Sequence, residues 1–345
     1  MVAESIRSTL DRVVEWGEPV VNRIDAINAF PYDPQTPLHL QQDGWQVIHH
    51  GVMIPNLPDP VRFFDIISVM GTSTSIPAFS VPSLVRTTRR DSVWLLVGSA
   101  ASRDNFGVLS KQDDCEFSAD GATLSYGKKL EIRQNGDEIA IEAAVPGLTA
   151  SLVLRPTPVI SHFAHIPGLY DHWSRLCRYE GTFDTDAGER LACSGLCTWE
   201  YARGRDNVPL PILLFTYQIV NISDTVQVLF VELRGPLDLV MQRSIYIREL
   251  GVDGTVLLRR TVTHEVTETL APHRTPDGVE MVLPRRFTWA GHDENGVEIV
   301  AIDGTCNDDF AYGMAAGFAG SYRYEGRYRG AEVTGCGYIE WIDRR

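Results

Sequence analysis

Three segments of the sequence carry side chains that could exchange protons with a bound molecule. The first contains two adjacent histidines, His49 and His50, and imidazole is the side chain that titrates nearest to neutral pH. Neighbouring side chains of a strand point to opposite faces, so at most one of the two histidines faces a given pocket. A half-buried histidine with a structural role is the commoner case. We take His50 as the candidate ligand contact of this segment.

Residues 161–175 form the second segment, which contains three histidines, His162, His165 and His172. Two of them together with Asp171 could ligate a metal ion. A proline and a glycine between the last two histidines would break any helix that held both on one face, and no H-E-x-x-H framework is present. We therefore predict no metal site. The alternatives are a loop with structural histidines and a loop that lines a ligand pocket, in which His172 and Trp173 would face the ligand.

The third segment, residues 194–204, contains one carboxylate, Glu200, within a strand predicted at residues 196–201. Strand alternation gives the two faces as Cys197, Trp199 and Tyr201 on one side and Leu196, Thr198 and Glu200 on the other. If burial raises the pKa of Glu200, this side chain can act as a general acid. A buried salt bridge is an equally weighted alternative, with the candidate partners Arg175, Arg178 and Arg203.

Two further strands add polar candidates. Tyr217 and Gln218 lie together on a predicted strand, where one of them would face inward and could orient a ligand by a hydrogen bond. Tyr338 lies on the last predicted strand, close to Glu340 and Trp341. We expect Gln218 and Tyr338 to contact the ligand and Tyr217 to assist the acid.

The elements that must position these residues are mostly β-strands. Apolar or alternating runs occur at residues 93–97, 138–145, 148–154, 212–220, 226–233, 286–290, 297–302 and 331–342. The runs at residues 212–220 and 226–233 predict a hairpin, and so do the runs at residues 286–290 and 297–302. Gly335 and Gly337 interrupt the last run, which fits a bulge or a close backbone approach. Antiparallel strands at this spacing indicate a barrel or a sandwich.

The N-terminal part of the chain has a different pattern. Residues 6–17 have the amphipathic spacing of one short helix, and residues 22–42 contain three prolines and read as a long wrapping segment. A length of 345 residues allows two domains. A charged, proline-containing interruption at residues 203–211 sets the predicted boundary. Residues 1–204 would hold the helix, the wrapping segment and a first β domain, and residues 205–345 a second β domain.

Composition excludes several classes of function. The chain has 31 Lys+Arg and 45 Asp+Glu, and a net charge of −14 argues against a cationic surface for nucleic acids or anionic membranes. No run approaches the roughly 18 apolar residues of a transmembrane helix. Residues 1–16 lack the pattern of a signal peptide, and the six cysteines form no C-x-x-C pair. We therefore expect a cytoplasmic protein with reduced thiols, and a homo-oligomer stays open.

Motifs in the C-terminal half resemble those of the lipocalin-like two-domain proteins related to carotenoid 1,2-hydratase and the AttH-type proteins. Residues 195–201 (Gly-Leu-Cys-Thr-Trp-Glu-Tyr) stand where that family has a glycine followed by an Asp-His-Glu-Trp-like motif. Residues 214–220 match its following aromatic strand, and residues 335–340 resemble its closing Gly-x-Gly-Tyr-x-Glu strand. Fungal lipocalin-like cyclases are a more distant comparison.

The sequence also departs from the family motif. Glu200 is kept, whereas Thr198 and Trp199 stand in the places of Asp and His, and Tyr201 replaces Trp. Carotenoid hydration needs an acid in this region, so the resemblance does not imply that same reaction. It implies two β domains with a hydrophobic ligand pocket inside or between them.

Together these observations predict an all-β, mainly antiparallel protein of two lipocalin-like barrel or sandwich domains. The expected activity needs no cofactor and acts on a small hydrophobic molecule, such as a terpenoid, steroid or polyketide, by hydration, dehydration, isomerisation or cyclisation. Glu200 would be the acid, with Tyr217 or His172 as its partner. The rings that would stabilise a developing cation are those of Trp173, Trp199 and Tyr201. The alternative is a noncatalytic carrier or sensor of a lipophilic ligand.

Overall fold

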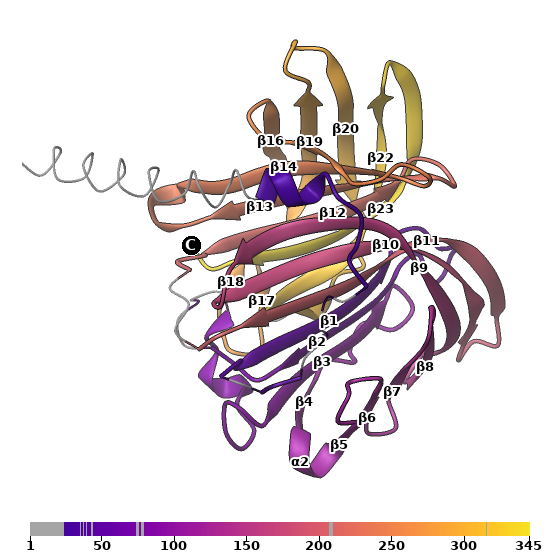
Figure 1. The fold of residues 1–345 in the computed structure, drawn as a ribbon, viewed down its shortest axis with the longest axis vertical. Helices are drawn as coiled ribbons and strands as arrows, with labels where there is room; N and C mark the ends of the chain where they lie inside the picture. The colour runs from indigo at the N-terminus through magenta and orange to yellow at the C-terminus, as the bar shows by residue number, and fades with distance from the viewer. Residues whose placement is uncertain are drawn as a thin grey trace, which may run out of the picture.

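The computed structural model describes residues 24–34, 36, 38, 40–42, 44–73, 76, 79–206, 210–314 and 316–345. Two large antiparallel sheets dominate this part of the chain, as Figure 1 shows, and they confirm the predicted all-β class. The helix predicted at residues 6–17 lies outside the described residues. Residues 24–28 are helical. No helix in the described part of the chain is long and apolar enough to cross a membrane.

Sheet A contains the first eleven strands and curls into a nearly closed barrel. Its strands are β1 (Val47–Ile54), β2 (Phe64–Met70), β3 (Ser92–Ser99), β4 (Gly107–Ser110), β5 (Cys115–Phe117), β6 (Thr123–Tyr126), β7 (Leu130–Asn135), β8 (Glu138–Val145), β9 (Leu148–Ile166), β10 (Tyr170–Thr185) and β11 (Arg190–Gly204). Their order is β4-β3-β2-β1-β11-β10-β9-β8-β7-β6-β5, so β11 lies between β1 and β10. This central position decides which side chains meet at the site.

Sheet B contains the later strands and forms a half-barrel. Its strands are β12 (Leu214–Asn221), β13 (Val226–Arg234), β14 (Val240–Glu249), β15 (Val256–Leu258), β16 (Val262–Thr269), β19 (Pro284–His292), β20 (Glu298–Cys306), β21 (Ala311–Met314), β22 (Gly317–Tyr328) and β23 (Ala331–Asp343). The order is β15-β14-β13-β12-β23-β22-β20-β19-β16, and β21 pairs with β22. The chain changes sheet between residues 204 and 214. A division into two domains at this point stays a prediction.

Short elements complete the described fold. They are the α-helix α2 (Lys111–Asp114), the 3-10 helices η2 (Pro82–Leu84) and η3 (Pro236–Asp238), and the two-stranded sheet of β17 (His273–Arg274) and β18 (Glu280–Met281). The side chain of Ser110 caps α2 by accepting a hydrogen bond from the backbone N–H of Asp113.

Both predicted hairpins are present. β12 pairs with β13, and β19 pairs with β20, in each case antiparallel. The glycines of the last strand mark a close approach, because a Cβ atom on Gly337 would lie 2.4 Å from Cζ of Tyr322. The pairing of β22 with β23 runs in register through Gly335 and Gly337, so the close approach, and not a bulge, explains these glycines.

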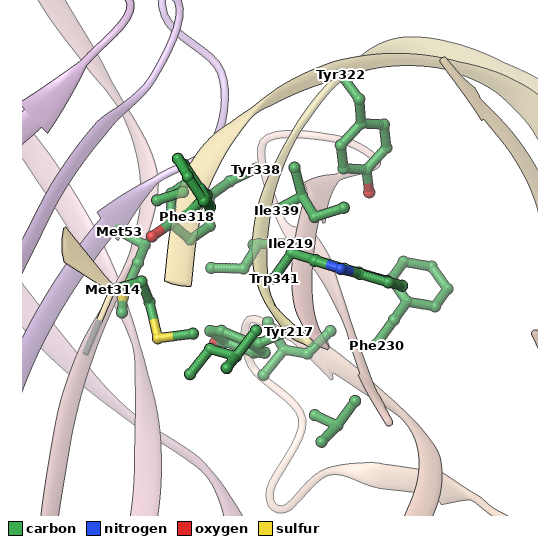
Figure 2. Close-up of a cluster of buried hydrophobic side chains, with 14 of the residues drawn as sticks. Met53, Tyr217, Ile219, Phe230, Met314, Phe318, Tyr322, Tyr338, Ile339 and Trp341 are labelled. Carbon is green, nitrogen blue, oxygen red and sulfur yellow. The ribbon is translucent and has the colours of Figure 1, made fainter. Parts of the chain in front are cut away.

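Two hydrophobic cores follow from strand alternation in sheet A. Residues of β1 at even positions, such as Ile48 and Val52, face the core inside the barrel, whereas Met53 belongs to the core between the two sheets. Figure 2 shows Met53 beside Phe318 and Tyr338, where sheet A meets sheet B. Because both faces of β1 are buried, each residue of this strand is committed to one of two separate interiors.

Polar bonds also join the two sheets at their buried contact. The hydroxyl of Tyr217 on β12 donates to Glu200 on β11 at 2.6 Å. The guanidinium of Arg248 on β14 donates to the hydroxyl of Ser174 on β10 at 3.0 Å. Hydrogen bonds made inside an apolar interior are costly to leave unmade, so these contacts fix how the sheets dock.

Candidate active site

A cavity of about 1030 Å³ lies between the outer face of sheet A and the inner face of sheet B. Its walls are mostly apolar and include Ile67, Trp94, Phe163, Ile212, Val231 and Leu258. Cavities of this size and character accommodate small organic molecules. The polar groups that reach the cavity are therefore candidates for chemistry on an apolar ligand.

Three of these polar groups come from adjacent strands of sheet A. Glu200 lies on β11, His49 on β1 and His172 on β10, and all three line the cavity. His49 and His172 each pair with Ala202, two residues beyond Glu200 on the central strand. Residues two apart on a strand share a face, so the three side chains project from the same side of the sheet.

The distances show a compact cluster around one carboxylate. Oε2 of Glu200 lies 3.7 Å from Nε2 of His172 and 3.9 Å from Nε2 of His49. Oε1 of Glu200 accepts the hydrogen bond from Tyr217 on the opposing sheet. Nδ1 of His49 lies 3.0 Å from the backbone oxygen of Ser68, and a carbonyl can only accept. Nδ1 of His49 therefore carries a proton, and Nε2 faces the carboxylate.

Small residues make room for this cluster. Glu200 pairs with Gly51 on β1 and with Ser174 on β10. A Cβ atom on Gly51 would lie 3.0 Å from Nε2 of His49, so a larger residue would displace the imidazole. Ala202 lies between the two histidines and lines the cavity. The sequence thus keeps bulk away from the positions that flank the carboxylate.

Glu200 is an anion at neutral pH. Burial alone would raise the pKa of its carboxyl, but the imidazoles of His172 and His49 outweigh burial and lower the pKa to about 2. The condition under which Glu200 could act as a general acid, a pKa raised by burial, is therefore not met. That condition rests on burial alone, and the two basic rings beside the carboxyl reverse the result. A group that is already ionised has no proton to give as a general acid.

Two of the groups beside that anion, His172 and Tyr217, are neutral. Burial lowers the pKa of His172, and the nearby Glu200 carboxylate opposes this effect. Burial and the charge of Glu200 hold the pKa of Tyr217 well above its usual value, so its hydroxyl stays protonated and donates to the carboxylate. A neutral His172 can accept a proton, which suits a general base.

The salt bridge proposed as an alternative for Glu200 does not form with Arg203. Nε of Arg203 instead donates to Asp171 at 2.7 Å, and Nδ1 of His165 lies 2.8 Å from the other oxygen of Asp171. Arg175 donates to the backbone oxygen of Thr157. Asp171 is thus engaged by these two side chains, apart from the cluster around Glu200.

Four sequence-predicted ligand contacts lie on the other side of sheet A. Trp173, Trp199 and Tyr201 belong to the core inside the barrel, where His50 packs against Trp199 and Tyr201 with ring centroids 5.7 and 5.5 Å apart. None of the four lines the cavity. Burial lowers the pKa of His50 to about 3, as expected of a structural imidazole. Strand alternation explains why these four residues do not line the cavity, because a residue next to His49, His172 or Glu200 on its strand must face the other side of the sheet.

Gln218 and Tyr338 are also absent from the cavity wall. Gln218 follows Tyr217 on β12 and therefore points to the opposite face of sheet B. Tyr338 is fully buried, and its hydroxyl lies between the carboxyls of Asp65 and Glu340. We do not carry either residue forward as a ligand contact.

The structure adds three residues that the sequence reasoning did not select for the site. His49, Phe163 and Glu340 line the cavity. A signal for His49 was present, because the alternating positions 48, 50, 52 and 54 of its strand read Ile-His-Val-Ile and are the more apolar set. Glu340 lies in the motif at residues 335–340, which resembles the closing strand of the AttH-type family. Phe163 had no such signal.

The cluster of His49, His172 and Glu200 also has side-chain types that can ligate a metal ion, with one atom from each lying within 4.8 Å of the others. Ligands placed about 2.1 Å from one zinc ion at tetrahedral angles lie roughly 3.4 Å apart. The observed separations of 3.7 and 3.9 Å from Glu200 are longer. The side chains would have to move inward to bind an ion, and the predicted absence of a metal stays a prediction.

Solved structures with the same fold include an AttH-type protein from Nitrosomonas europaea and kievitone hydratase from Nectria haematococca. The first has a TM-score of 0.63 and 14% identity, and the match covers 91% of this chain and 99% of that protein. The second has a TM-score of 0.58 and 13% identity, with 91% and 98% covered. At these identities the likeness shows the fold, and it confirms the lipocalin-like resemblance.

At the level of sequence, residues 67–345 match a family described as a family of unknown function, DUF6670. No curated protein matches the chain.

Proposed function

The chain belongs to the DUF6670 family, and we propose that it is an enzyme that acts on a small hydrophobic molecule by acid–base chemistry, without a cofactor. The reaction class is the addition or loss of water at a carbon–carbon double bond, or an isomerisation or cyclisation that passes through the same kind of cation. The ligand would occupy the cavity between the two sheets.

One observation carries this proposal: an ionised carboxylate is fixed at the wall of a largely apolar cavity, beside two imidazoles. Glu200 is 2% exposed and is held by Tyr217. In a medium of low dielectric a fixed anion attracts a developing positive charge far more strongly than it would in water. A ligand whose double bond becomes protonated would therefore be stabilised next to Glu200.

The neighbouring groups have complementary roles. His172 is neutral and can take a proton from a water molecule that attacks the cation. Tyr217 keeps the carboxylate in place through its 2.6 Å hydrogen bond. Phe163, whose ring contacts both His172 and Tyr217 edge-on, and Trp94 supply aromatic surface at the cavity wall. These two rings replace Trp173, Trp199 and Tyr201, which lie in the barrel interior, as candidates for stabilising a cation.

The fold comparison favours hydration as the first reaction to test. Kievitone hydratase is named as a hydratase and has the same fold over 91% of this chain. We transfer only the reaction class to this chain.

The test begins with the small molecules that accompany the protein. The natively purified chain is denatured, and any released compound is identified by mass spectrometry. That compound is then incubated with fresh protein in ¹⁸O-labelled water; if none is found, a panel of terpenoid, steroid and polyketide alkenes is used. A product that has gained labelled water, or a rearranged isomer, supports the proposal.

Variants make this assay specific to the site. Glu200→Gln should bind the compound but convert it at least about tenfold more slowly, since it lacks the charge that stabilises the cation. His50→Gln is the matched control, because His50 lies in the barrel core, and its turnover should equal that of the unmodified chain. A compound that binds and is always returned unchanged would support a carrier or sensor instead. Equal turnover by Glu200→Gln would remove Glu200 from the mechanism.

A further inference from the structure

A second carboxyl reaches the cavity from the opposing sheet. Glu340 on β23 lines the cavity and pairs with Tyr217 on β12, so the two side chains share the face that looks toward sheet A. Oε1 of Glu340 lies 3.0 Å from the hydroxyl of Tyr338, and that hydroxyl lies 2.9 Å from Oδ2 of Asp65 on β2. Three oxygens from two sheets therefore form one short chain.

The proton count of this chain decides its charge. A tyrosine hydroxyl has one proton to donate, and an ionised carboxylate can only accept. If Asp65 and Glu340 were both ionised, Tyr338 could satisfy one of them, and the other would face an oxygen lone pair at hydrogen-bond distance. Asp65 is 0% exposed and Glu340 4%, so bulk water solvates neither carboxylate well. At least one of the two carboxyls must hold a proton.

The surroundings favour Glu340 as the protonated group on the cavity side. The charged and titratable groups that act on it are Glu200 from β11, Asp65 from β2, and Tyr338 on its own strand, with Tyr217 on the adjacent strand β12. Burial raises the pKa of Glu340 well above its usual value, and the negative charge of Glu200 raises it further. Among the described residues, Oε2 of Glu340 makes no hydrogen bond, which leaves it available to a ligand.

We propose that Glu340 is the proton donor of the cavity, and that Tyr338 and Asp65 are positioning residues that hold its protonated carboxyl in place. This assignment rests on the proposed function and supplies the acid that Glu200 cannot be. The two glutamates of one cavity then have opposite protonation states, which is how paired carboxyls divide the roles of acid and anion.

The step balances with water as the only co-reactant. The O–H bond of Glu340 breaks, and the π electron pair of the ligand forms the new C–H bond, which leaves a cation at the neighbouring carbon. Water provides the electron pair of the new C–O bond and loses one proton to His172. The ligand gains one H₂O, and the proton on His172 returns to Glu340 through solvent. While Glu340 is charged, Tyr338 donates its one proton to it, so in that state Asp65 is the carboxyl that holds a proton.

Infrared spectroscopy of the full chain tests this assignment without a ligand. A protonated carboxyl has a C=O stretching band separate from those of carboxylates. We expect such a band near neutral pH in the unmodified chain and its loss in Glu340→Gln. Asp65→Asn identifies any second band that belongs to Asp65. Tyr338→Phe should keep the Glu340 band but move its frequency, because Oε1 loses its hydrogen-bond partner.

A charge variant adds a readout that a purely structural role would not move. Glu200→Gln removes the negative charge that disfavours ionisation of Glu340, so the Glu340 band should titrate away at a pH about one unit lower. A chain without a neutral-carboxyl band that depends on Glu340, or an unchanged titration in Glu200→Gln, overturns the assignment even if the ligand is converted. A band that behaves as expected, combined with a ligand that is never converted, overturns the proposed function but not the protonation of Glu340.

Discussion

The Asp65→Asn variant should be more stable than the wild-type chain, and the difference in their free energies of unfolding should grow as the pH rises toward neutral. Burial raises the pKa of Asp65 from 3.8 to about 7, and the hydrogen bond from Tyr338 opposes that rise only in part. Between these two pH values the folded state holds one more proton than the unfolded state, so the wild-type chain loses stability as the pH increases. About three pH units at roughly 1.4 kcal/mol per unit give a loss of about 4 kcal/mol.

Asparagine does not titrate, and its carbonyl can still accept the hydrogen bond of Tyr338. The free energies of unfolding of the variant and the wild-type chain should therefore be similar near pH 4. They should diverge in favour of Asp65→Asn by about 4 kcal/mol at pH 7 to 8. The measurement is urea unfolding, followed by tryptophan fluorescence, at several pH values.

The difference between the two chains isolates Asp65 from the other groups that titrate. Buried histidines such as His50, whose pKa is lowered to about 3, give a slope of opposite sign in the same pH range, but they are common to both proteins. Asp91→Asn is the control. Burial raises the pKa of Asp91, but hydrogen bonds from Thr87 and Ser110 outweigh it and lower the pKa, so its difference from wild type should be constant above about pH 5. A constant difference for Asp65→Asn as well would show that Asp65 is ionised in the folded protein and would refute the reasoning.

Three further predictions concern the cluster around Glu200. Tyr217→Phe should lower the free energy of unfolding by about 2 kcal/mol, because a buried carboxylate loses a charge-assisted hydrogen bond; a urea-measured loss under about 0.5 kcal/mol would show that Glu200 has another donor. His172→Gln should change both the affinity for an apolar fluorescent dye bound in the cavity and the pH dependence of that affinity. Trp199→Leu should cost about 3 kcal/mol of stability and leave the dye affinity unchanged. If instead Trp199→Leu changed the dye affinity and His172→Gln did not, the ligand would bind inside the barrel. Protein purified in the presence of zinc should contain well under one equivalent of metal, and a full equivalent that His172→Ala removes would contradict the spacing argument.

Much of the fold could be predicted because it depends on local pattern. Both hairpins and the last strand follow from β-rich runs separated by turn residues, and the structure contains them near the expected positions. Strand alternation also predicts that Trp199 and Glu200 lie on opposite faces. Applied consistently, the same rule excludes Trp199 from a pocket that contains Glu200.

Two features of the site depend on contacts between residues far apart in the sequence. Glu200 meets His49 only because β11 lies between β1 and β10, an order that no local pattern specifies. Glu340 reaches the same cavity only because sheet B docks on the outer face of sheet A. These contacts join positions about 150 residues apart along the chain, and their geometry is set by packing.

The sequence by itself determined the class of secondary structure, the face on which each strand residue lies, and Glu200, His172 and Tyr217 as a candidate group. The tertiary structure alone decided which face looks into the cavity and which carboxyl keeps its proton. The physical reason is that a pKa depends on every charge and dipole within a few ångströms. Two imidazoles beside Glu200 favour its anion, whereas burial and the charge of that anion keep Glu340 protonated.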